Sequence, residues 1–152
     1  MDISPIDAQL YIAALPQSSD ASELAARGVR LVLNMIPIRT PSGLRTEPLR
    51  ALWLPWLDSS LLPLPTWLLR RGTLAALQAL HSGESVLTYC REGRHRSVAM
   101  ACAILIAQGM TAGQAMARVK IARSVADPYA PHVTAAIRRF EASWNGGGRP
   151  VD

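Results

Sequence analysis

The sequence predicts an α/β fold in which helices flank a central, mostly parallel sheet of about four to five strands. Two observations carry this prediction. Short apolar or β-branched stretches of strand length recur along the chain, and patterns with helical spacing separate or follow them. Strands that alternate with helices pair in parallel, because the helix supplies the crossover connection. Ligands in such sheets bind beyond the carboxyl ends of the strands.

The N-terminal half is predicted to hold three strands and one short helix, whose bounds follow from apolar patterning and capping residues. In chain order these are the strand Gln9–Leu15, a helix capped by Ser19 or Asp20 and stopped by Gly28, the buried strand Val29–Ile36 and the apolar strand Ala51–Leu57. The loop Pro37–Pro48 separates the last two strands, and Asp58 opens the loop after them.

The C-terminal half is predicted to hold one apolar strand among amphipathic or buried helices. These are the helix Pro65–Leu80, the strand Ser85–Tyr89, and the helices Ser97–Gln108, Thr111–Arg123 and Ala130–Trp144. Residues 1–144 are expected to form a single domain of ordinary size. The Gly-Gly-Gly sequence predicts a flexible C-terminal tail over 145–152.

Composition argues against several classes of protein. The longest apolar run, Val98–Ala107, is far shorter than the roughly 20 residues of a membrane-spanning helix, so no stable membrane insertion is expected. The N-terminal segment lacks a basic stretch, which favours a cytoplasmic location over secretion. The net charge of +5 suggests an anionic partner or a solvated basic face. No nucleic-acid partner is expected, because no basic stripe with interleaved aromatic residues is present.

The segment Cys90–Ser97 has the composition of a phosphate-binding loop. It follows a predicted buried strand and leads into a predicted helix, so its N–H groups and the first helical turn can converge on one anion. Gly93 permits the tight turn that such a loop needs. The residues inside the loop are expected to contact substrate: Arg91, Glu92, Gly93, Arg94 and His95.

Cys90 is the candidate nucleophile. A free cysteine has a pKa of about 8.5, but a helix N-terminus and a neighbouring Arg can lower it to roughly 3.5–7.5. Arg96 offers a planar fork that can bind two phosphoryl oxygens. Ser97 can donate a hydrogen bond to the sulfur and ease its departure from a phosphocysteine. The alternative for Cys90 alone is a buried, unreactive cysteine, and the strand–loop–helix placement argues against it.

The pattern Cys-x5-Arg-Ser on a strand–loop–helix resembles the signature loop of the protein-tyrosine phosphatase superfamily, and the chain is similar in size to its compact dual-specificity branch. The similarity extends over nearly the whole chain and includes the segments Ile3–Ile12, Gly28–Asn34, Trp53–Asp58 and Gly109–Ala117. The resemblance implies a phosphatase fold, no cofactor, and metal-independent hydrolysis of phosphate monoesters through a phosphocysteine intermediate.

By the same resemblance, Asp58 is the expected general acid, which protonates the leaving oxygen and later accepts a proton from water. On its own, an Asp in this place would more ordinarily cap a loop. Asp127 is the reserve candidate, since Glu47 lies too early in its loop. The chain departs from the family pattern at Tyr89, where the family usually has His, and at Asp127-Pro128-Tyr129, where many members carry an Asn-Pro-type loop.

The resemblance implies a phosphorylated protein as first choice of substrate. Basic residues at Arg91 and Arg94, with His95 beside them, resemble the phosphoinositide and inositol (pyro)phosphate branches and keep a phosphorylated small molecule or lipid as an alternative. A non-catalytic, phosphate-binding pseudophosphatase is the other alternative. Tyr89 favours it, whereas the presence of Cys90 with Arg96, Ser97 and Asp58 argues against it.

The other cysteine is expected to have no chemical role, and the histidines are expected to bind no metal. Cys102 lies in an apolar helix and is expected in the core. His95 is expected to face solvent or substrate from within the loop, with a solvated side chain as the favoured interpretation. No metal site is expected, because His81, His95 and His132 are scattered without the spacing of metal ligands.

Overall fold

The computed structural model of the protein describes residues 1–147. Within them, strands and α-helices follow in the order β1 (Asp2–Pro5), β2 (Leu10–Ala14), α1 (Ala21–Ala26), β3 (Val29–Asn34), β4 (Arg50–Trp53), α2 (Thr66–His81), β5 (Ser85–Cys90), α3 (Arg96–Ala107), α4 (Ala112–Ala122) and α5 (Pro131–Ala142). Short 3-10 helices lie at Ser18–Asp20 and Ser42–Arg45, and a π-helical turn occupies Ser143–Gly147. None of the helices in this part of the chain is both long and apolar enough to cross a membrane.

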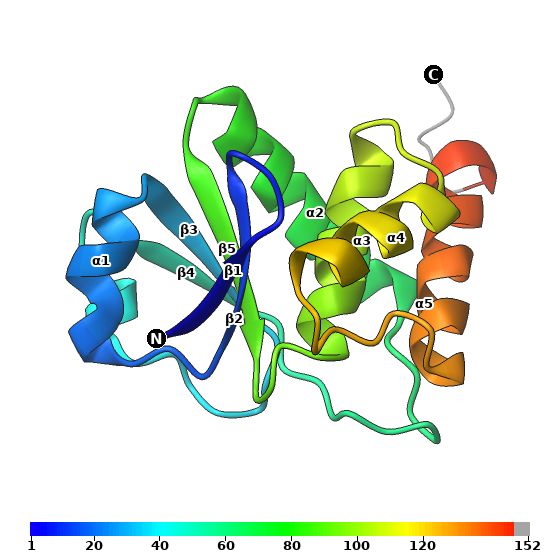
Figure 1. The fold of residues 1–152 in the computed structure, drawn as a ribbon, viewed down its shortest axis with the longest axis horizontal. Helices are drawn as coiled ribbons and strands as arrows, with labels where there is room; N and C mark the ends of the chain where they lie inside the picture. Colours follow the sequence, from blue (N-terminus) through cyan, green and yellow to red (C-terminus); the bar gives the residue numbers. More distant parts are fainter. Residues whose placement is uncertain (148–152) are drawn as a thin grey trace.

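The strands form one sheet in the order β1-β2-β5-β3-β4. β1 runs antiparallel to β2, and the other neighbouring pairs are parallel. The mostly parallel sheet expected from the sequence is therefore confirmed. β5 lies at the centre and is buried along its whole length. α1 lies on one face of the sheet, and α2 to α5 gather on the other (Figure 1).

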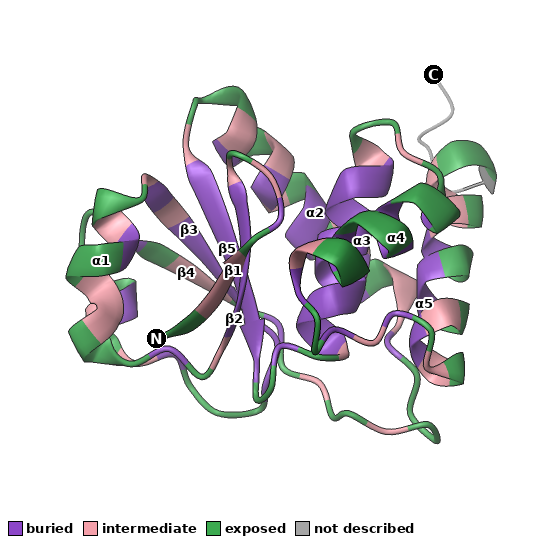
Figure 2. Ribbon diagram, in the orientation of Figure 1, coloured by how far each residue is buried: buried purple, intermediate pink, exposed green. Residues whose placement is uncertain are grey.

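α3 is the core helix of the domain (Figure 2). Every side chain from Arg96 to Ile106 is buried, because the helix packs between the sheet and the neighbouring helices α2, α4 and α5. A helix that is covered on all sides needs no polar face, which explains the apolar run in its sequence. Cys102 is fully buried there, as predicted, and the burial raises the pKa of its thiol.

Two strands differ from the expectation. The apolar pattern predicts a strand as far as Leu57, but β4 ends at Trp53. Pro55 has no N–H to offer the ladder, and pairing stops after the Leu54 N–H donates to the Asn34 carbonyl at 2.8 Å. The apolar pattern did not predict β1, because β1 is a short, half-exposed edge strand. Pairing with β2 holds it in place.

The C-terminal end matches the predicted helix to within two residues. α5 ends at Ala142 rather than Trp144, and the π-helical turn continues from it. The Trp144 ring stacks on Phe140 with 5.6 Å between centroids. Of the predicted tail 145–152, residues 145–147 belong to this turn and 148–152 lie outside the described residues. The flexibility of the tail stays a prediction.

Candidate active site

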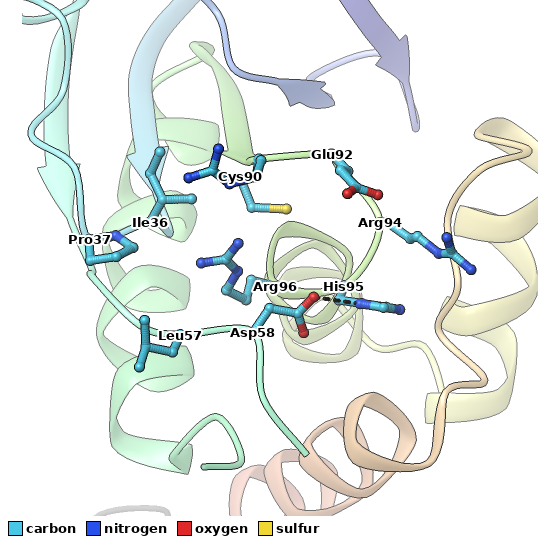
Figure 3. Close-up of a pocket in the computed structure, with 10 residues that line it drawn as sticks. Ile36, Pro37, Leu57, Asp58, Cys90, Glu92, Arg94, His95 and Arg96 are labelled. Atoms are coloured by element: carbon cyan, nitrogen blue, oxygen red, sulfur yellow. Dashed lines mark hydrogen bonds and ion pairs between the residues drawn. The ribbon is translucent and has the colours of Figure 1, made fainter. Parts of the chain in front are cut away.

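A cavity of about 440 Å³ opens at the carboxyl edge of the sheet (Figure 3). This is the edge where parallel sheets bind their ligands. The lining residues come from the loops after β3, β4 and β5 and from the start of α3: Ile36, Pro37, Leu57, Asp58, Cys90, Arg91, Glu92, Arg94, His95 and Arg96. Of the site residues predicted from the sequence, Gly93 and Ser97 are buried and do not line the cavity.

Asn34 orders the wall formed by the loop after β3. Its buried side-chain amide donates to the carbonyl of Ile38 at 2.8 Å and to the hydroxyl of Thr40 at 3.0 Å. Its side-chain carbonyl accepts the N–H of Ile36 at 2.9 Å. These bonds satisfy the buried side-chain amide of Asn34 and the buried N–H of Ile36. They place Ile36 and Pro37 as an apolar side of the cavity.

Gly93 occupies the tightest point of the loop between β5 and α3. Its φ of +62° lies in the left-handed region that glycine adopts without strain. A Cβ atom at this position would lie 2.6 Å from Nη2 of Arg123. Both the turn and the close approach of the guanidinium therefore require glycine here.

Arg123 holds the outer side of the same loop. Its Nε donates to the Gly93 carbonyl at 2.8 Å, and its Nη2 donates to the Glu92 carbonyl at 2.9 Å. The other side of the guanidinium binds the Asp2 carboxylate at 2.8 and 3.0 Å. With their carbonyls held outward, these peptide units can turn their N–H groups toward an anion in the cavity.

Cys90 lies at the end of β5, with its sulfur 3.1 Å from the Ser97 hydroxyl. Burial opposes the thiolate, but the Ser97 hydroxyl, the backbone N–H groups of Ser97 and Arg94, and the charge of Arg96 together lower the pKa of Cys90. This stabilisation comes from the loop and from the start of α3. Tyr89 is buried, and the burial raises the pKa of its hydroxyl to about 12, so it brings no charge to the thiol.

Arg96 begins α3 and faces Cys90 and Asp58 across the cavity (Figure 3). Its Nη1 donates to the Trp56 carbonyl at 2.7 Å, which fixes the guanidinium plane. Its Nε is buried and has no hydrogen-bond partner among the described residues. The side chain is thus anchored at one end and keeps a free donor for a phosphoryl oxygen.

Asp58 lies between two histidines, and this arrangement corrects the expectation for His95. Its carboxylate is 2.8 Å from Nδ1 of His95 and 3.0 Å from Nε2 of His132. His95 is therefore bound to the candidate acid and is not a freely solvated side chain. Partial burial favours the neutral carboxyl, but the hydrogen bonds to both histidines and the charges of His95 and Arg96 lower the pKa of Asp58.

Comparison with known proteins identifies the family. No family model matches the chain. The human protein dual specificity phosphatase 28 is 31% identical over 134 residues, which cover 87% of this chain and 73% of that protein. The chain belongs to the dual specificity phosphatase family. The mouse protein of the same name is 36% identical to this phosphatase over 115 residues, covering 74% and 68% of the two chains.

Solved structures confirm the predicted fold of this phosphatase. Human DUSP28 superimposes with a TM-score of 0.83 at 24% identity, over 96% of this chain and 97% of that one. PTPMT1 in complex with PI(5)P gives 0.86 at 22% identity, over 97% and 99%. A human tyrosine phosphatase-like serine/threonine/tyrosine-interacting protein gives 0.79 at 20% identity, over 95% and 99%. At these identities the likeness establishes the shared fold alone.

Asp127, the reserve candidate for the acid, does not line the cavity of this phosphatase. Its backbone N–H donates to the Arg94 carbonyl at 3.0 Å. Its carboxylate lies 3.7 Å from Nε2 of His95 and 4.0 Å from the Arg94 guanidinium. Asp127 is placed to position the loop, whereas Asp58 faces the cavity itself.

Sequence reasoning missed two residues of the site, Arg123 and His132. Arg123 reaches the loop from the end of α4, and His132 reaches Asp58 from the first turn of α5. His132 has no motif spacing to Cys90 that marks it. The one available signal for Arg123 was its position at the end of a predicted amphipathic helix. The structure shows that the side chain is buried there, and a buried Arg needs a partner.

Proposed function

We propose that this phosphatase hydrolyses phosphate monoesters through a phosphocysteine intermediate, without a metal ion as reactant, and that its principal substrates are phosphorylated proteins. The observation that carries the proposal is one shared cavity. The sulfur of Cys90 with its lowered pKa, the guanidinium of Arg96 and the carboxyl of Asp58 all face it (Figure 3). Membership in the dual specificity phosphatase family supports a phosphorylated substrate.

In the first step, the Cys90 thiolate attacks the phosphorus of the substrate. A sulfur–phosphorus bond forms while the bond from phosphorus to the leaving oxygen breaks, and Asp58 gives its proton to that oxygen. Arg96 binds two of the remaining oxygens through its guanidinium, whose Nε has no hydrogen-bond partner among the described residues. The loop N–H groups stabilise the charge on the same oxygens.

In the second step, water attacks the phosphocysteine. The Asp58 carboxylate accepts a proton from this water, a new phosphorus–oxygen bond forms, and the sulfur–phosphorus bond breaks. The Ser97 hydroxyl, 3.1 Å from the sulfur, donates to the departing Cys90 thiolate. Inorganic phosphate leaves, and Asp58 returns to its protonated state.

The lowered pKa of Asp58 bears on the first step, which needs the protonated carboxyl. The two histidines favour the carboxylate, whereas a bound phosphate dianion disfavours it, because like charges raise a neighbouring carboxyl pKa. Substrate binding therefore promotes protonation of Asp58 where the proton is required. His95 and His132 keep the carboxyl aimed at the cavity.

A second class of substrate has its own support. Arg91 and Arg94 line the cavity together with His95, so a substrate with further phosphates meets positive charge beside the reacting group. The shared fold with PTPMT1, solved in complex with PI(5)P, keeps a phosphoinositide or inositol phosphate as the alternative substrate for this chain.

The experiment that tests the mechanism compares the two cysteines. Cys90→Ser should lose hydrolysis of a small aryl phosphate and still bind inorganic phosphate, because serine preserves the loop but its hydroxyl stays protonated. Cys102→Ala is the matched control, since Cys102 is buried in α3 and should leave hydrolysis intact. Hydrolysis by Cys90→Ser at the wild-type rate would contradict the phosphocysteine mechanism.

A further inference from the structure

The cluster of Asp58, His95 and His132 has a geometry that acid catalysis alone does not require. A ligand-type atom from each side chain lies within 4.8 Å of the other two. A small cavity of about 10 Å³ has all three residues in its lining, together with Arg96 and apolar residues of the surrounding loops, and one water-sized sphere needs about that volume. The rings of the two histidines meet edge to face with 5.1 Å between centroids. The cluster is compact, and it borders a space of this size.

We propose that Asp58, His95 and His132 form an inhibitory site for a divalent transition-metal ion, with Zn²⁺ as the ion that fits best. Two imidazole nitrogens and one carboxylate oxygen are a zinc donor set, whereas Mg²⁺ and Ca²⁺ prefer oxygen alone. Zinc bonds of about 2.0–2.1 Å at tetrahedral angles separate the ligands by about 3.3 Å. Nδ1 of His95 lies 2.8 Å from one carboxylate oxygen of Asp58, and Nε2 of His132 lies 3.0 Å from the other. Both nitrogens therefore already lie close to the carboxyl group with which they would share the ion.

The second nitrogen of His95 supports this assignment. Its Nε2 is buried without a hydrogen-bond partner among the described residues, and the Asp127 carboxylate lies 3.7 Å away. Histidines that bind metals usually direct their other ring N–H toward a carboxylate, which fixes the tautomer and the ring orientation. Asp127 is placed to orient His95 with Nδ1 toward the ion.

The three ligands come from separate parts of the fold. Asp58 lies in the loop between β4 and α2, His95 precedes α3, and His132 lies in the first turn of α5. A bound metal ion would therefore connect the loop that carries Asp58 to α3 and α5. The carboxylates of Asp58 and Asp127 offset the charge of the ion, whereas Arg96 and Arg94 oppose it. We expect an affinity in the micromolar range, below that of structural zinc sites built from thiolates.

Occupancy has a defined chemical consequence. A carboxylate oxygen of Asp58 that binds a metal cannot carry the proton for the leaving group. Zn²⁺ should therefore slow hydrolysis of an alkyl phosphate, which needs that proton. It should have much less effect on an activated aryl phosphate, whose leaving group departs without help.

Binding is tested on Cys90→Ser, in which no thiolate can bind the metal, so the outcome does not depend on the phosphatase mechanism. Calorimetric titration with Zn²⁺ should give one site per chain, and Co²⁺ should give the visible absorption of a low-coordinate site. In the Cys90→Ser background, His132→Gln or His95→Gln should weaken Zn²⁺ binding by at least about 100-fold. Asp127→Asn in the same background should weaken it by about tenfold. His81→Gln, at an exposed histidine at the end of α2, is the matched control and should change nothing.

Circular dichroism confirms that each variant is folded, and the two ligand histidines provide independent tests. Zn²⁺ binding that survives both His132→Gln and His95→Gln in the Cys90→Ser background would overturn the proposal. Equal inhibition by Zn²⁺ of alkyl and activated aryl phosphates in the wild-type enzyme would overturn the inhibition through Asp58. The expected result is unequal inhibition that EDTA reverses.

Discussion

Replacement of Arg123 by Met should reveal how far the active site depends on one buried guanidinium. The side chain is 2% exposed, and its five hydrogen bonds join the loop carbonyls to Asp2 and Ser4. Removing one partner of a buried ion pair costs about 3–5 kcal/mol. The Asp2 side chain is 61% exposed, so water can solvate its carboxylate once Arg123 is gone. We therefore expect a loss at the lower end of this range, about 3 kcal/mol of unfolding free energy.

Urea unfolding measures this loss, and Arg118→Met is the matched control. Arg118 is exposed on α4, the helix that Arg123 follows, so its replacement should change stability by less than about 0.5 kcal/mol. The hydrogen bond from Arg123 lowers the folded-state pKa of Asp2 below its unfolded value of 3.8. This stabilisation is present above the unfolded pKa and is lost as pH falls through the folded pKa. The difference in unfolding free energy between wild type and Arg123→Met should therefore be largest at neutral pH and should shrink below about pH 4.

A second readout separates positioning from mere stability. If Arg123 holds the loop N–H groups toward the anion, its replacement should raise the pH at which iodoacetate alkylates Cys90 and weaken binding of inorganic phosphate. A folded Arg123→Met variant with wild-type alkylation and wild-type phosphate affinity would refute the positioning role. Equal unfolding free energies for Arg123→Met and Arg118→Met would refute the stability argument.

Four further results are expected. Asp58→Asn should slow hydrolysis of alkyl phosphates by roughly 10²–10⁴-fold and of activated aryl phosphates far less, and equal losses would show a structural role. Tyr89→His should lower the pH at which Cys90 is alkylated, whereas an unchanged profile would show that the loop and Arg96 already set the thiol pKa. Arg91→Ala with Arg94→Ala should reduce kcat/KM more for an inositol polyphosphate than for a neutral phosphotyrosyl peptide, and rising salt should shrink the difference; equal losses would favour a protein substrate. Vanadate should inhibit the wild-type enzyme, and loss of activity in EDTA would contradict hydrolysis without a reactant metal.

Local sequence features predicted the centre of the candidate site, and the structure brings most of the predicted residues to one cavity. The segment Cys90–Ser97 combines the end of a buried strand, a glycine turn and the start of a helix. Each of these features depends on residues that are adjacent in the sequence, so each can be predicted from it. The fold class followed from the alternation of strands and helices, which is also a local pattern. Asp58 was located through the resemblance to a family, because its own surroundings are typical of a loop cap.

The residues that sequence reasoning missed act over long separations. Arg123 and Asp2 are 121 positions apart, and His132 and Asp58 are 74 positions apart. No periodicity links such pairs, so only the packing of α4 and α5 against the loops brings them together. The same reason explains why His95 was expected to be solvated, since its partner Asp58 approaches from the loop after β4.

The most direct test of the mechanism is to trap the covalent intermediate. Enzyme mixed with an aryl phosphate and quenched in acid during turnover should gain the mass of one phosphoryl group, and peptide mapping should place that group on Cys90. Asp58→Asn should raise the trapped fraction for an activated substrate, because the variant lacks the base for the second step. Turnover with no phosphorylated peptide, or with the group on a residue other than Cys90, would contradict the account.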